Sequence, residues 1–266
     1  MTFTPRVIFH LGFQKTGTTS VQALLNSNLS LLSDVDVRVY GDATKDLRAA
    51  GKNFCAEPSP DREKELIKTL ERHFSLVFDN GKPVCLISDE NILGRVPYSN
   101  TGDVVSWAER ILPVIEGCAS GTDLAFHFYT RPAESWRNSM YRQCVKRAGV
   151  TGSYGVWARS SPFQEDWPDW KEWADRISKA TSAPVTFTCM DEELKSGAVL
   201  GTALLENAGL SEAAINALIP VERQNMALSD AALQFMRFVN LLPLKERLRL
   251  RISERVEAFD SRAKHK

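Results

Sequence analysis

The stretch Arg6–Leu25, RVIFHLGFQKTGTTSVQALL, decides the fold. An apolar run ends at Gly12, a second glycine follows at Gly17, and apolar residues then recur at helical spacing through Thr18–Asn28. The run before Gly12 has the length of a buried strand, and the pattern after Gly17 is that of an amphipathic helix with Val21, Leu24 and Leu25 on one side. The stretch therefore predicts a strand, a tight loop and a helix.

The same alternation of strand and helix continues along the chain. Further strands are expected at Val35–Tyr40, up to about Ser88, in DLAFHFYTR and at Pro184–Cys189, with helical patterns between them. The polar segment Asp42–Pro60 is expected to be a loop. Strands separated by helices predict a three-layer α/β/α fold with a central parallel sheet. We expect one domain, with an α/β core in residues 1–195 and a helical C-terminal part in residues 196–266.

Composition excludes several classes of protein. The 33 basic and 33 acidic residues balance, so net charge indicates neither nucleic acid nor membrane as a partner. No apolar run reaches the roughly 20 residues that span a bilayer, and no signal-like segment opens the chain. The five cysteines are widely spaced, without a metal-binding or disulfide pattern. We expect a cytoplasmic protein with buried free thiols and no metal.

The loop between the glycines has the spacing of a phosphate-binding loop, G-x-x-x-x-G. Backbone N–H groups and the start of the helix can face one anion there, and Thr18, Thr19 and Ser20 add hydroxyl donors. In nucleoside triphosphatases the lysine follows the second glycine. Here Lys15 precedes Gly17, which places an ammonium group at the mouth of the loop beside the bond between the phosphate and what it carries.

At this point FQKTGTTSVQ resembles the 5′-phosphosulfate loop of sulfotransferases that use 3′-phosphoadenosine-5′-phosphosulfate (PAPS). The Trp-rich segment, PVTFTCMDEEL and PVERQNMALSDAALQFMRFVN resemble, in their order, the bacterial carbohydrate-type members. The resemblance implies that Lys15 contacts the oxygen that bridges phosphate and sulfate. It also implies that the 5′-phosphate is held by the rest of the loop, namely by Thr16, Gly17, Thr18, Thr19 and Ser20.

A second anion site is needed for the 3′-phosphate of PAPS. The family's motif for it is a strand, then an arginine and a proline, with a serine further on, and Arg131, Pro132 and Ser139 resemble that motif. Arginine can bind phosphate through two parallel hydrogen bonds, and serine can donate a third. In relatives a later loop closes over the nucleotide, and Arg223 and Asn225 are the candidates in this chain.

Sulfuryl transfer to a hydroxyl also requires a general base. Members of the family use a histidine or a glutamate, and the candidate here is Glu90, which follows a buried strand in LISDEN. Three alternatives stay open: Glu90 or Asp89 caps a helix, His10 is the base, or Asp89 holds magnesium as in a phosphate-loop kinase. Ser88 is a further candidate for positioning the donor.

The resemblance implies transfer of a sulfuryl group from PAPS to a hydroxyl, with 3′,5′-adenosine bisphosphate (PAP) as product and an acceptor of carbohydrate type. The other functions considered are a nucleotide kinase and a nucleotide-binding protein without turnover. Loops Gly94–Gly102 and Gly149–Gly155 are the candidates for acceptor contacts. The tryptophans at three-residue steps are interpreted as core side chains rather than a sugar platform: Trp167, Trp170 and Trp173.

Overall fold

The computed structural model describes residues 4–94, 104–159, 168–221 and 228–264. The chain divides into two compact units. The first, here called the sheet unit, consists of Met1–Pro97, Thr101–Arg131 and Trp170–Gln224. The second, here called the helical unit, consists of Tyr98–Asn100, Pro132–Asp169 and Asn225–Lys266. No helix in the described ranges is long and apolar enough to cross a bilayer.

The sheet unit is built on five parallel strands in the order β2-β3-β1-β4-β5. In β1 and β3 the last residues, His10 and Ser88, are register partners, so both strands end at the same level. β1 lies in the middle, with β3 and β2 on one side of it and β4 and β5 on the other. Open α/β sheets bind ligands at the carboxyl ends of the strands, at the point where the strand order reverses in this way. The strands are β1 (Arg6–His10), β2 (Val35–Val39), β3 (Val84–Ser88), β4 (Asp123–Thr130) and β5 (Val185–Cys189).

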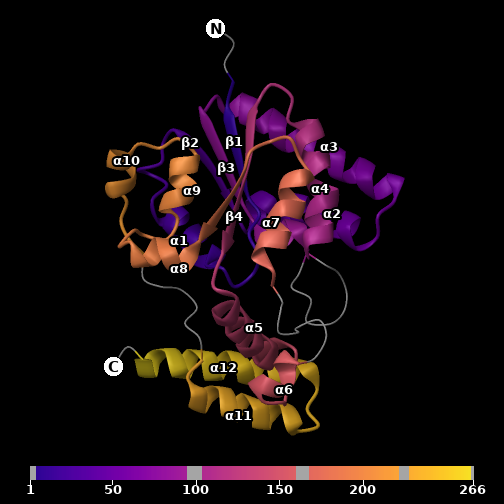
Figure 1. Ribbon diagram of the computed structural model, residues 1–266, viewed down its shortest axis with the longest axis vertical. Coiled ribbons are helices and arrows are strands. Elements are labelled where there is room, and N and C mark those ends of the chain that lie inside the picture. Colours follow the sequence, from indigo (N-terminus) through magenta and orange to yellow (C-terminus); the bar gives the residue numbers. More distant parts are fainter. Residues whose placement is uncertain (1–3, 95–103, 160–167, 222–227, 265–266) are drawn as a thin grey trace. The chain divides into compact units, whose positions relative to one another are not determined.

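Helices cover both faces of this sheet, which confirms the expected three-layer fold (Figure 1). One face carries α1 (Thr18–Ser27), α8 (Met190–Lys195), α9 (Thr202–Asn207) and α10 (Glu212–Asn216). The other carries α2 (Lys45–Ala56), α3 (Pro60–Asn80), α4 (Val104–Cys118) and α7 (Trp170–Lys179).

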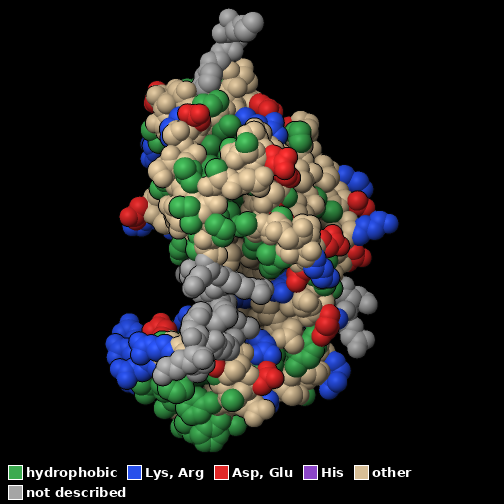
Figure 2. All heavy atoms as spheres, turned by 90° about the vertical axis from the view of Figure 1, so that its left-hand side faces the viewer, with side chains coloured by type: hydrophobic (Ala, Val, Ile, Leu, Met, Phe, Trp, Pro, Cys, Tyr) green, Lys and Arg blue, Asp and Glu red, His purple; other side chains and the backbone are tan. Residues whose placement is uncertain are grey.

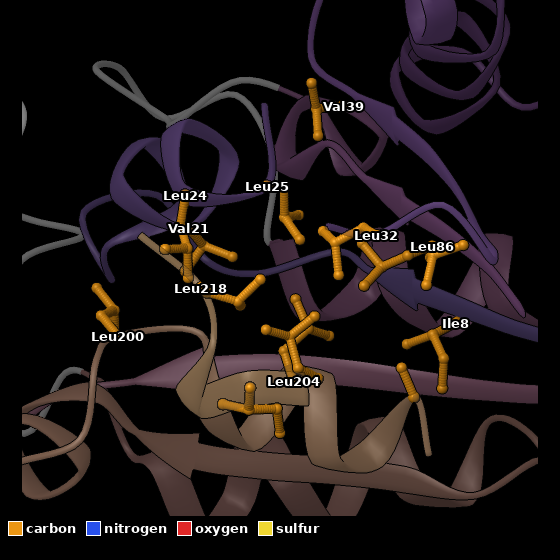
Figure 3. Packing of buried hydrophobic residues seen from close by; sticks show 14 of the residues in the cluster. Ile8, Val21, Leu24, Leu25, Leu32, Val39, Leu86, Leu200, Leu204 and Leu218 are labelled. Carbon is orange, nitrogen blue, oxygen red and sulfur yellow. The ribbon is translucent and has the colours of Figure 1, made fainter. Parts of the chain in front are cut away.

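Alternate residues of β1 enter the two cores, as the period of a strand requires. Ile8 belongs to the core under α1, where Figure 3 shows Val21 and Leu24 of α1 opposite Leu204 of α9. Phe9 points the other way, and its ring centroid lies 6.2 Å from that of Phe74 in α3. The apolar run in the sequence is therefore long enough to supply both faces with fully buried side chains.

One prediction about local structure is wrong. The segment expected to be a loop forms a 3-10 turn, Asp42–Thr44, followed by the twelve-residue helix α2. The buried residues of α2 recur at helical spacing and alternate with charged residues. In the sequence, only a narrow apolar stripe therefore indicates this helix. The stripe consists of Leu47, Ala50, Gly51, Phe54 and Cys55.

The helical unit contains α5 (Ala133–Arg147), α6 (Tyr154–Ala158), α11 (Asp230–Leu241) and α12 (Glu246–Lys264). Asn240 of α11 donates from Nδ2 to the carbonyls of Val145 and Val150, at 2.8 and 3.0 Å, where α5 ends. Lys146 of α5 pairs with Glu257 of α12 at 3.2 Å. α8, α9 and α10 belong to the sheet unit although they follow residue 189, so the two units do not divide at residue 195.

Candidate functional site

The loop between β1 and α1 has two residues in the left-handed region of backbone conformation. Gly17 has φ 94° and caps α1, and a Cβ there would lie 2.6 Å from Cδ2 of Leu200. Lys15 has φ 69°, a conformation that costs a non-glycine residue on the order of 1–3 kcal/mol. The backbone that turns the chain into α1 therefore also determines where the Lys15 side chain leaves the loop.

Polar atoms crowd Gly12 around the position that a Cβ would take. Nε2 of His10 is 3.3 Å from that position, and the hydroxyl oxygens of Thr18 and Thr16 are 3.4 and 3.6 Å from it. Nε2 of His10 and Oγ1 of Thr18 are buried and have no hydrogen-bond partner among the described residues. Buried polar atoms are rarely left without a partner, so both atoms are candidates for a hydrogen bond to water or to a ligand.

His10 itself is a buried, neutral residue. Its Nδ1 lies 2.8 Å from Oγ of Ser88, which joins the ends of β1 and β3. Burial, with the neighbouring His127 as a second cause, lowers the pKa of His10 to about 3. An imidazole with such a low pKa is a weak proton acceptor near neutral pH, which argues for a structural role.

Glu90 begins the short 3-10 helix η2 (Glu90–Leu93), which is separated from β3 by Asp89 alone. Nε2 of Gln22 in α1 donates to Oε2 of Glu90 at 3.2 Å and to the carbonyl of Ser88 at 3.0 Å. Gln14 of the loop donates to the carbonyl of Gly94 at 3.0 Å. Burial raises the pKa of Glu90, a shift that makes a carboxylate a better proton acceptor.

Asp89, and not Glu90, caps this turn. Oδ1 of Asp89 accepts from the N–H of Asn91 at 2.9 Å, while Oδ2 accepts from Thr44 at 2.7 Å and pairs with Arg48 at 2.6 Å. Asp89 is fully buried. Oδ2 ties the start of α2 to the end of β3 and Oδ1 caps the turn, so both oxygens are engaged within the protein and little of the carboxylate is left for a magnesium ion.

Arg131 follows β4 and reaches the loop. Its Nη1 donates to the carbonyl of Lys15 at 3.4 Å, and its Nε lies 3.4 Å from Oδ2 of Asp191 in the first turn of α8. The guanidinium and the Lys15 loop thus lie at the same end of the sheet. The Asp191 carboxylate lies beside the arginine, where a phosphate would also be attracted.

The remaining predicted residues lie elsewhere or were not described. Ser139 is on α5, in the helical unit. Arg223, Asn225, Trp167 and residues 95–103 lie outside the described part of the chain. Within the loop, Thr19 is exposed, and the N–H of Ser20 donates to the carbonyl of Gly17 at 2.9 Å as α1 begins.

The tryptophans of α7 pack against the loop. The ring of Phe13 lies 5.1 Å from the ring of Trp170 and 5.1 Å from that of Trp173. Trp173 is buried. This arrangement agrees with the interpretation of these two side chains as core, and it holds one side of the loop against the sheet unit.

Sequence reasoning missed Gln22 and Asp191. The helical pattern of α1 places Gln22 one turn after Thr18, a spacing that could have indicated a side chain on the same face as the loop. Asp191 is sixty residues from Arg131 in sequence, and only the pairing of β5 with β4 brings it there. No local signal marks it.

Comparison with known proteins does not identify a family for this chain. A scan of the chain against protein-family models and a search of curated proteins both found no match.

Proposed function

We propose that the protein is a sulfotransferase that moves a sulfuryl group from PAPS to a hydroxyl of a carbohydrate or related metabolite. The observation that carries this proposal is the hydrogen bond from Arg131 to the carbonyl of Lys15. Two cationic residues, assigned by the resemblance to opposite ends of one adenosine nucleotide, come from β4 and from the β1 loop and meet at one end of the sheet.

The residues of the loop fit a phosphate ester. The buried hydroxyl of Thr18, which has no partner among the described residues, stands at the start of α1, where the helix dipole favours an anion. Lys15 and Arg131 supply positive charge, and the resemblance adds Thr16, Thr19, Ser20, Ser139 and Arg223. PAPS would supply the activated sulfuryl group, and PAP would remain bound after transfer.

In the transfer, the acceptor oxygen forms a bond to sulfur while the bond from sulfur to the bridging oxygen breaks. Negative charge grows on that oxygen, and the Lys15 ammonium group stabilises it. Glu90 takes the proton of the acceptor hydroxyl, a step typically worth about 10²- to 10⁴-fold in rate. Because burial raises the pKa of Glu90, turnover should fall on the acid side of the pH profile. Glu90→Gln should lower turnover by about that factor and remove the acid limb from the activity that remains.

The assignment of the 3′-phosphate can be tested with two ligands and one variant. Isothermal titration would compare PAP with adenosine 5′-monophosphate, which lacks the 3′-phosphate. We expect the wild type to prefer PAP by about tenfold or more, as charge-assisted bonds to phosphate imply, and Arg131→Gln to remove the preference while keeping the affinity for the monophosphate. Equal loss of affinity for both ligands would show that Arg131 only supports the fold.

The reaction class is tested by ligand-induced stabilisation and by radiolabelled transfer. PAP at a hundred times its dissociation constant should add about 2.7 kcal/mol of stability, and labelled sulfate should pass from PAPS to members of a panel of hydroxyl acceptors. Preferential stabilisation by magnesium–ATP would indicate a kinase. Tight binding of PAP without transfer to any acceptor would indicate a binding protein.

A further inference from the structure

The helical unit carries an apolar stripe on α11. The helix packs through Leu233, Met236 and Val239, while Phe235, Phe238 and Leu241 are 50, 60 and 68% exposed. These three residues are spaced three apart and form one stripe on the opposite side of the helix. Side chains of this size are seldom left in water together unless the surface binds something.

A basic stripe lies on the neighbouring helix α12. Arg247, Arg251, Arg255 and Arg262 are exposed and follow one another at steps of four, four and seven residues, so they share one face. The stripe is about 20 Å long, at 1.5 Å per residue.

Of the acidic residues of α12, Glu254 borders this stripe, three residues after Arg251, while Glu257 and Asp260 lie away from it. Glu254 and Glu257 pair with Arg147 of α5 at 3.7 and 3.6 Å. Asp260 accepts a hydrogen bond of 2.9 Å from the backbone N–H of Ser229, which caps α11. The stripe therefore keeps an excess of positive charge, with four arginines against the one bordering glutamate, which also pairs with Arg147.

Two apolar side chains connect the stripes. At about 100° per residue, Leu248 and Phe259 lie between the arginines and the side of α12 that carries Asp260 and faces α11. They are 49 and 77% exposed. Figure 2 shows hydrophobic side chains gathered beside a group of Lys and Arg side chains in the lower part of the picture, at the height where Figure 1 draws α11 and α12.

We propose that this α11–α12 surface docks on a membrane that contains anionic lipids. Arginines attract lipid phosphates while their stems lie on apolar surface, and phenylalanine and leucine enter the boundary between headgroups and acyl chains. A soluble polyanion would use the arginines but not the phenylalanines. The proposal is independent of the reaction assigned to the sheet unit.

Vesicle flotation with the full chain tests it. We expect binding to phosphatidylcholine vesicles that contain about a third phosphatidylglycerol and none to phosphatidylcholine alone, with most binding lost at about 0.5 M salt. The double variant Arg251→Glu/Arg255→Glu should bind about thirtyfold more weakly or worse, since each basic residue contributes about fivefold. Phe235→Ser/Phe238→Ser should also weaken binding, and inorganic phosphate should not compete.

The matched control is Lys64→Glu/Lys68→Glu, which makes the same change in charge at the same spacing on exposed positions of α3. It should bind vesicles like the wild type, and circular dichroism should show all variants folded. Equal loss in this control, or absence of binding to anionic vesicles, would overturn the proposal. A dimer in light scattering that only the phenylalanine variant dissociates would assign the surface to a second copy of the chain and overturn it as well.

Discussion

Lys15 combines two roles that can be separated by substitution. Its backbone is in the left-handed region, which favours glycine, while its ammonium group is assigned to the leaving oxygen. Lys15→Gly should therefore be at least as stable to denaturant as Lys15→Ala, and both should lose about 10²- to 10³-fold in kcat. Urea unfolding and single-turnover transfer would measure the two effects. Turnover of Lys15→Gly within tenfold of the wild type would remove the lysine from the mechanism.

Glu90 and Asp89 are neighbours with opposite expected effects on stability. The folded-state pKa of Glu90 is raised, so its contribution to stability is complete below the ordinary carboxyl pKa and is lost as pH rises through the raised value. Glu90→Gln should be more stable than the wild type at pH 8, with the difference vanishing below about pH 4. Thermal unfolding across this range would measure it, and a constant difference at all pH values would contradict the assignment.

Asp89→Asn is the matched comparison, because Asp89 lies beside Glu90 but is held by Arg48 and Thr44. Removing its charge leaves Arg48, which is mostly buried, without its partner. We expect a loss of about 2–4 kcal/mol at neutral pH. A gain in stability would mean that the ion pair does not hold α2 on the sheet.

At the scale of elements, the contact between the loop and Leu200, in the connection from α8 to α9, depends on Gly17. Gly17→Ala combines a strained φ with a clash against Leu200, and it should cost about 1–3 kcal/mol from the backbone alone. In Gly17→Ala/Leu200→Ala the clash is relieved but the strain remains, so the two changes should cost less together than the sum of the single changes. Chemical denaturation of the four proteins measures this coupling, and strict additivity would contradict it.

The first turn of α8 brings Asp191 against Arg131, and its charge should oppose a phosphate at that arginine. Asp191→Asn should raise the affinity for PAP about three- to tenfold, as expected for one charge a few ångströms away, and leave that for adenosine 5′-monophosphate unchanged. Glu192→Gln on the same helix is the control. Weaker binding of PAP by Asp191→Asn would instead make Asp191 the residue that positions Arg131.

The elements were largely predictable from sequence because buried parallel strands are continuous apolar runs, as in Arg6–Leu11 and Val84–Ser88. α2 was missed because its apolar stripe is narrow among charged residues. The loop and Glu90 were predictable because motif and strand end lie next to each other in sequence. Gln22 was marked only by its spacing of one turn from Thr18, which does not name its partner Glu90. Asp191 was not predictable, since its ion pair with Arg131 follows from the strand order and not from any local pattern.

At the scale of the whole molecule, the chain separates two kinds of surface. The sheet unit holds the loop, Glu90 and Arg131, while the exposed phenylalanines and arginines belong to α11 and α12 of the helical unit. If the two proposals are both correct, each ligand should protect its own elements. This can be tested in one experiment on the intact chain.

Hydrogen exchange read by mass spectrometry should show PAP slowing the amides of the Gly12–Thr19 loop and the first turn of α1, because these N–H groups would bind phosphate. Anionic vesicles should slow α11 and α12 and leave the loop unchanged, since burial in the interface suppresses local opening of those helices. Vesicles of phosphatidylcholine alone are the control. Protection of the loop by vesicles, or of α11 by PAP, would mean that one ligand acts on both surfaces, and the two functions would then have to be treated as coupled.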